Sequence, residues 1–158
     1  MIFESDFNTD SLIFNGIGIG QNLTTLPSDS VTEYYDASGN NGGVKIKDGW
    51  VLTDNGIQYV LKKGIVDFVR IKRNGIDQLT ELEPDDVVKL IGPPAKTSTD
   101  SVTYVFDLVI IAKIYHYTRK KLNIHFSNDD KKICELEIGR KNWLQQRLYR
   151  SGRFRYKN

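Results

Sequence analysis

The two histidines of the chain, His116 and His125, lie in one segment that reads as two strands joined by a turn. If "TRKKLN" (118–123) closes a hairpin, the two rings face each other across the strands. One neutral and one protonated histidine at that distance could act as base and acid in RNA cleavage, and the pair could also hold a metal. Two ligands are too few for a metal site, however, and two exposed histidines on a wet sheet face are the simpler interpretation. We therefore expect no catalytic residue, no metal and no cofactor.

Other motifs that could suggest chemistry have structural explanations. The glycines of "NGIGIGQ" (15–21) lack the spacing of a phosphate-binding loop, and no Lys-Ser or Lys-Thr follows them, so a glycine-bearing hairpin is predicted. Cys134 is the single cysteine, which excludes an internal disulfide and favours a reducing cytosol. Because it alternates with polar residues, Cys134 is predicted to be a buried small side chain and not a nucleophile.

A short helix is predicted where the sequence reads "PDDVVKLIGPP" (84–94). Pro84 suits a first helical turn, Asp85 and Asp86 have the sign that a helix N-terminus prefers, and Gly92 with the prolines after it ends the helix. The residues expected to form its buried stripe are Val87, Val88, Leu90 and Ile91.

Two blocks of sequence recur in the same order. "SDSVTEYYD" (28–36) matches "TDSVTYVFD" (99–107), and "NGIQYVLKKGIVDFVRI" (55–71) matches "LNIHFSNDDKKICELEI" (122–138). A tandem repeat is the prediction.

The predicted fold is α+β, with two tandem units of short helix plus antiparallel strands forming a shared, curved sheet. Residues 1–72 form the first α+β repeat, residues 73–139 the second, and residues 140–158 a basic C-terminal helix or tail. In "KICELEI", apolar residues alternate with Glu135 and Glu137, which is typical of a half-buried strand with one wet face.

Charge is distributed unevenly along the chain. The net charge is +2, yet residues 1–139 carry 15 basic and 20 acidic side chains, and residues 140–158 carry seven basic and no acidic ones. The tail alternates Arg and Lys with aromatics in "GRFRYK", a composition that suits single-stranded nucleic acid as an alternative to a frayed end. No basic, apolar leader begins the chain, and the longest apolar stretch (102–115) contains charges, so a cytoplasmic protein without a membrane partner is expected.

The motifs "LIGPP" (90–94), "NGIQY" (55–59) and "LNIHF" (122–126), within a tandem of helix-plus-sheet units, resemble the β-lactamase inhibitor protein architecture. Among cytosolic bacterial proteins the plan is similar to immunity proteins of polymorphic and contact-dependent growth-inhibition toxins. The resemblance implies a protein that is not an enzyme and that covers the active site of a cognate toxin, which we expect to be a nuclease.

That resemblance also implies that the toxin binds the concave, wet face of the sheet. The alternation of side chains places these partner-binding candidates there: Tyr34, Asp36, Asp107, His116, His125, Glu135 and Glu137. Two alternatives remain open at this stage: a small ribonuclease that uses His116 and His125, and a nucleic-acid-binding protein that uses the basic tail (140–158).

Overall fold

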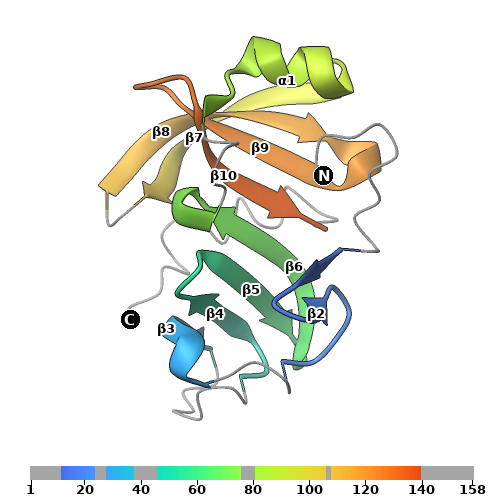
Figure 1. Ribbon diagram of the computed structural model, residues 1–158, viewed down its shortest axis with the longest axis vertical. Helices are drawn as coiled ribbons and strands as arrows, with labels where there is room; N and C mark the ends of the chain where they lie inside the picture. The colour runs from blue at the N-terminus through green and yellow to red at the C-terminus, as the bar shows by residue number, and fades with distance from the viewer. Residues whose placement is uncertain (1–11, 24–27, 38–45, 76–80, 106–107, 140–158) are drawn as a thin grey trace.

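In the computed structural model, an antiparallel sheet of eight strands forms the body of the protein (Figure 1). The structure describes residues 12–23, 28–37, 46–75, 81–105 and 108–139; within them, the side chains of residues 28, 74, 100–105 and 108–110 are not described. The strand order is β3-β4-β5-β6-β10-β9-β8-β7. The predicted class is confirmed at this level: a mainly antiparallel sheet with one α-helix in the described part of the chain.

The strands of the large sheet are β3 (Val31–Asp36), β4 (Gly49–Thr53), β5 (Ile57–Lys62), β6 (Ile65–Lys72), β7 (Lys96–Val105), β8 (Leu108–Tyr117), β9 (Leu122–Ser127) and β10 (Ile133–Ile138). A separate hairpin consists of β1 (Ile13–Phe14) and β2 (Ile17–Gly18). The helix is α1 (Pro84–Ile91), and the 3₁₀ turns are η2 (Ser28–Ser30), η4 (Arg73–Gly75) and η6 (Thr118–Lys120).

The sheet consists of two runs of consecutive strands that meet in its centre. Strands β3 to β6 follow one another in space as in sequence, and so do β7 to β10. The last strand of each run, β6 and β10, pair antiparallel with each other. The first strand of each run, β3 and β7, therefore lies at an edge of the sheet.

Tight turns with a left-handed backbone connect neighbouring strands. Lys63 and Gly64, with φ of 54° and 81°, join β5 to β6. Asn15 and Gly16, with φ of 52° and 79°, close the β1–β2 hairpin, as expected for "NGIGIGQ". Both pairs have the positive φ angles of a type I′ turn, whose twist matches that of an antiparallel hairpin.

The helix α1 begins and ends at the predicted residues. At its start, the Asp86 carboxylate accepts a hydrogen bond from the Glu83 backbone N–H at 3.0 Å. At its end, Gly92 has φ of 87° and donates its N–H to the Val88 carbonyl at 2.8 Å. Val87 is fully buried, but Leu90 is 51% exposed, so the expectation that Leu90 belongs to the buried stripe is wrong.

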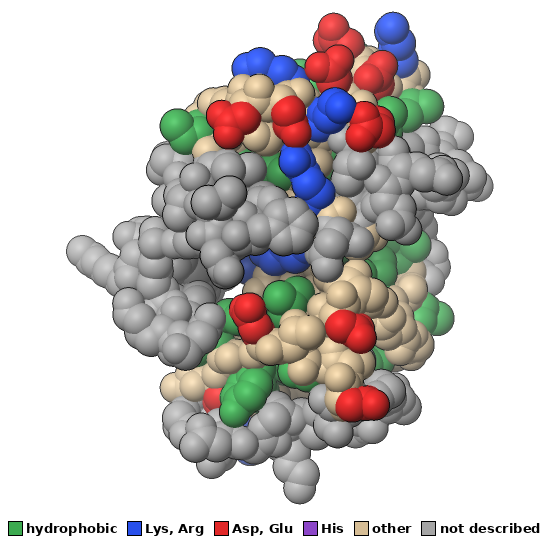
Figure 2. Space-filling model, turned by 60° about the vertical axis from the view of Figure 1, so that its left-hand side comes forward, with side chains coloured by type: hydrophobic (Ala, Val, Ile, Leu, Met, Phe, Trp, Pro, Cys, Tyr) green, Lys and Arg blue, Asp and Glu red, His purple; other side chains and the backbone are tan. Residues whose placement is uncertain are grey.

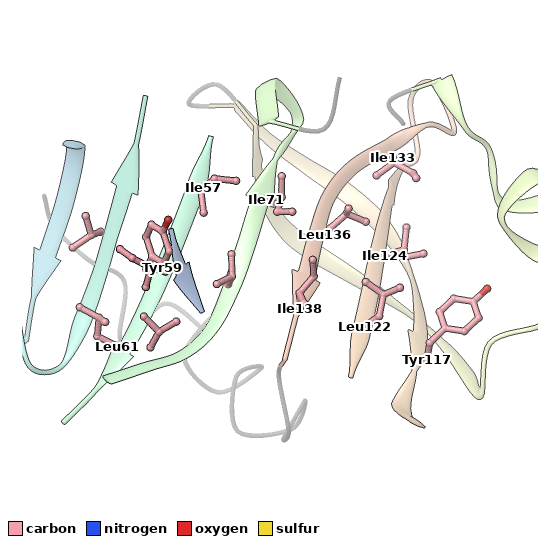
Figure 3. Close-up of a cluster of buried hydrophobic side chains, with 14 of the residues drawn as sticks. Ile57, Tyr59, Leu61, Ile71, Tyr117, Leu122, Ile124, Ile133, Leu136 and Ile138 are labelled. Atoms are coloured by element: carbon pink, nitrogen blue, oxygen red, sulfur yellow. The ribbon is translucent and has the colours of Figure 1, made fainter. Parts of the chain in front are cut away.

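One face of the large sheet carries the hydrophobic core. Figure 3 shows side chains of β5, β6, β9 and β10 lining this apolar face, together with Tyr117 from the end of β8. The Tyr59 hydroxyl donates to the Phe14 carbonyl at 2.7 Å, which ties the β1–β2 hairpin to the sheet. The Tyr117 hydroxyl donates to the Gly92 carbonyl at 2.9 Å, which ties down the end of α1. Each large apolar side chain buried here stabilises the fold by about 1.5–3 kcal/mol.

Candidate functional site

The second face of the sheet carries a band of polar side chains. Residues that pair directly across neighbouring strands share a face. One such row crosses the sheet through Glu33, Leu52, Gln58, Arg70, Glu137, Asn123, His116 and Lys96. The parallel row beside it contains Lys72, Glu135, His125, Ile114 and Ser98.

Five of these side chains form a buried charge network at the junction of β6, β10 and β9. His125 Nε2 lies 2.7 Å from Glu137 Oε1, and His125 Nδ1 lies 3.7 Å from Glu135 Oε2. Arg70 Nε donates to Glu137 Oε2 at 3.1 Å, and Lys72 Nζ donates to Glu135 Oε1 at 2.6 Å. Each carboxylate is therefore paired with one cation from β6, and the ring of His125 lies between the two carboxylates.

The exposure predicted for this face is wrong at the candidate residues of β8, β9 and β10. The side chains of His125 and Glu137 are completely buried, that of Glu135 is 2% exposed, and His116 is also buried. Every residue of β10 is buried, so this strand is covered on both faces and not on one. Burial of two carboxylates is tolerated because each is paired with a cation from β6 and lies beside a ring nitrogen of His125.

His116 does not face His125 across the strands. The turn contains η6 and Lys121, and this pairs His116 with Asn123 and His125 with Ile114. The expected register is therefore wrong by two residues, which keeps both rings on the second face but makes them diagonal neighbours. His116 Nδ1 lies 2.8 Å from Asn123 Oδ1, and its Nε2 lies 2.7 Å from Ser98 Oγ. Burial lowers the pKa of His116, an effect that the hydrogen bond with Asn123 partly opposes.

This geometry is unsuited to cleavage of RNA. Each ring is held by its own partners, and neither ring is accessible, since His116 is 1% and His125 0% exposed. A substrate phosphate in this conformation cannot reach either nitrogen pair. The other candidate for nucleic-acid binding, the basic tail (140–158), lies outside the described residues.

His125, Glu135 and Glu137 are also a group that could hold a metal ion, since they offer ligand atoms within 4.8 Å of one another. The two ring nitrogens, however, face different carboxylates, whereas a metal would bind one nitrogen and draw both carboxylates toward it. The second oxygen of each carboxylate is already engaged by Lys72 or Arg70. The positive charge that a metal would supply is thus present as side chains, and the cluster is best explained as ion pairs that stabilise the sheet.

Arg70 and Lys72 are the members of the network that the sequence reading missed. They alternate with Val69 and Ile71 in "VRIK", just as Glu135 and Glu137 alternate with apolar residues in "CELEI". The available signal in the sequence was that these two strands alternate in the same way and carry charges of opposite sign. The pairing of β6 with β10, which brings these residues together, is not visible in the sequence.

Tyr34 and Asp36 lie on the other face of the sheet. Tyr34 pairs with Val51, which pairs with Tyr59 and, through it, with the core residues Val69 and Ile138. The predicted binding residues are therefore not gathered on one surface. The cause is that "VTEYYD" has no clear apolar alternation, so its facing could not be fixed from sequence. Asp107 lies outside the described residues.

The edge strand β3 provides a second candidate site. Thr32, Glu33 and Tyr34 are exposed, and the exposed fraction of Tyr34 is 37%. Between residues 28 and 37 the charged residues are Asp29, Glu33 and Asp36, with no lysine or arginine. Figure 2 shows mainly acidic charged side chains on the end of the molecule that holds β3 to β6, whereas both signs appear on the α1 end. We call η2 and β3 (28–36) the acidic edge.

Comparison with models of protein families, with curated proteins and with solved structures returned no match to this chain. Within the described residues, the helix is too short and too polar to cross a bilayer. The features that bear on function are thus the buried charge network and the acidic edge.

Proposed function

We propose that the protein is an immunity protein of the bacterial cytoplasm, which binds a cognate antibacterial toxin and covers its active site without performing chemistry itself. The observation that carries this proposal is the acidic edge, an edge strand on which Glu33 and Tyr34 are exposed and which has no lysine or arginine. Tyrosine gives a large contact area at a low cost in side-chain entropy, and it is enriched among residues that dominate binding energy. Carboxylates beside it favour a partner rich in lysine and arginine.

The sign of this surface favours a nuclease as the toxin. A nuclease binds phosphates with lysine and arginine, so its active-site face is positively charged. The acidic excess of residues 1–139 would attract such a face over a distance and raise the association rate. The same excess repels nucleic acid, which makes competition with the toxin's own substrate the expected mode of inhibition.

The proposal includes two tandem units, residues 1–72 and 73–139. Its support is that each stretch supplies four consecutive strands and that the last strand of each lies in the centre of the sheet. In this arrangement the buried charge network fastens β6 of one unit to β10 of the other. His116, His125, Glu135 and Glu137 then act by holding the sheet together, and Glu33, Tyr34 and Asp36 contact the toxin.

Co-expression with the candidate toxin tests the proposal. The C-terminal domain encoded by the gene directly upstream is induced with and without this protein, and growth is followed. We expect that domain to arrest growth and the protein to restore it, and that Glu33→Lys weakens the rescue. Asp129→Lys is the matched control, because Asp129 is exposed in the β9–β10 turn, away from the acidic edge. Toxicity without rescue by the unaltered protein would refute the proposal.

A further inference from the structure

We infer that the acidic edge binds its partner by strand addition: β3 pairs through its backbone with an extended, basic segment of another protein. This inference rests on the proposed function, because the partner it describes is the toxin. It adds to that proposal the binding mode and the chemical character of the segment that is bound.

The hydrogen-bond pattern of β3 determines which backbone groups face outward. The Ala37 N–H donates to the Asp48 carbonyl at 2.8 Å, so these two residues form a hydrogen-bonded pair. In an antiparallel ladder, hydrogen-bonded pairs alternate with pairs that are not bonded to each other. Tyr35 therefore bonds to Trp50 in β4, and the N–H and carbonyl of Tyr34 point away from β4 to the open side of the sheet.

The strand is already ordered for such a partner. At the N-terminal end of β3, the Ser30 carbonyl accepts a hydrogen bond from the Asp54 N–H at 2.8 Å. At its C-terminal end, the Ala37 N–H donates to the Asp48 carbonyl. Among the described residues, β3 pairs with β4 alone and is the terminal strand of the sheet. An edge that is ordered in advance loses little conformational entropy when a further strand is added.

The side chains of the acidic edge select the charge of the added strand. Glu33 lies on the second face of the sheet, and Tyr34 and Asp36 lie on the apolar face. Glu33 is exposed, whereas Asp36 is half-buried, so Glu33 is the carboxylate that can meet a side chain opposite it in an added strand. A lysine or arginine at that position would pair with Glu33 across the strands. A second copy of β3 is disfavoured, since the acidic edge has no lysine or arginine to meet the carboxylates of another copy.

A titration of the intact protein with a synthetic peptide tests this inference. The probe is a short, capped peptide of threonine and valine with one central lysine, which can lie opposite Glu33. Binding is followed through the amide resonances of the protein in a nitrogen–proton correlation spectrum. We expect the largest shifts at Tyr34 and its neighbours in β3. Two control peptides test the charge and the backbone contact without any change to the protein. One has glutamate in place of lysine, and the other has N-methyl groups on the amides that face β3. Each control should bind at least about 5-fold more weakly than the probe. Equal binding of all three peptides, or shifts that do not include β3, would overturn the inference.

A pair of variants separates this inference from the proposed function. Tyr34→Ala removes the aromatic side chain, whereas Tyr34→Pro also removes the outward N–H and leaves the ladder to β4 intact. With the toxin, we expect Tyr34→Pro to bind about 3–10-fold more weakly than Tyr34→Ala, the effect of one lost hydrogen bond. Equal affinities with rescue retained would refute strand addition and leave the immunity function standing. Peptide binding to β3 without any rescue would refute the toxin as partner and retain the basic strand as ligand.

Discussion

Replacing Glu137 by glutamine removes one negative charge from the centre of the buried charge network at nearly constant volume. The Glu137 side chain is completely buried, and it contacts both Arg70, at 3.1 Å, and His125, at 2.7 Å. Breaking a buried ion pair by removing one partner costs about 3–5 kcal/mol, because the remaining charge is left uncompensated. The lower end applies here, since Arg70 retains 14% exposure and the glutamine oxygen can still accept a hydrogen bond. We therefore expect the free energy of unfolding to fall by about 3 kcal/mol.

Urea unfolding measures this loss. With a denaturant slope of about 2 kcal/mol per molar, the midpoint should decrease by about 1.5 M. The matched control is Glu81→Gln, because Glu81 also pairs with a cation, Lys132 at 2.6 Å, but is 73% exposed. No resolvable change in midpoint is expected for that control. If the two variants shift the midpoint equally, the buried charge network does not stabilise the sheet as argued. A further variant, Arg70→Met combined with Glu137→Gln, should recover part of the loss because it removes the uncompensated cation.

Three further predictions concern single residues. Because burial lowers the pKa of His116 below its ordinary 6.5, the unfolded chain takes up the proton first, so stability should fall as the pH decreases from about 6.5 toward the folded pKa. Urea midpoints across that window should depend less on pH in His116→Gln, and an unchanged dependence would contradict the assignment. Burial raises the pKa of Cys134 to about 12, so iodoacetamide should leave the folded protein unmodified and alkylate it promptly in urea; equal rates in both conditions would show an accessible thiol. Gly49 has φ of 150°, and in Gly49→Ala the added methyl would overlap the Tyr35 carbonyl oxygen. The free energy of unfolding should fall by about 3 kcal/mol, and amide exchange in β3 should become faster. In the control Gly64→Ala the added methyl meets no atom within 4 Å, so the cost should be only about 1 kcal/mol.

Local features of the fold were predictable because they depend on neighbouring residues. The limits of α1 follow from Pro84 and Gly92, and the β1–β2 and β5–β6 turns follow from Asn15-Gly16 and Lys63-Gly64. Errors appeared where the prediction needed a register between strands. The turn after β8 displaced His116 by two residues relative to His125, which preserved the face and changed the partner.

The candidate site depended far more on tertiary structure. Alternation placed Glu135, Glu137 and His125 together on one face, opposite the core, and that part was confirmed. It could not show that this face is buried, because a polar residue with a buried ion-pair partner gives the same pattern as an exposed one. Nor could it show the facing of Tyr34 and Asp36, which follows from pairing across β4 and β5.

The sequence by itself therefore determined where the helix and the turns lie, and which residues within a strand share a side. These are consequences of backbone geometry over a few residues, since side chains alternate with a period of two in every strand. Only the tertiary structure decided that Arg70 and Lys72 meet Glu137 and Glu135, partners 67 and 63 residues away in the chain. It also decided that β3 is an edge. Both facts depend on which strands become neighbours, and that choice is made by the packing of the whole sheet and its core.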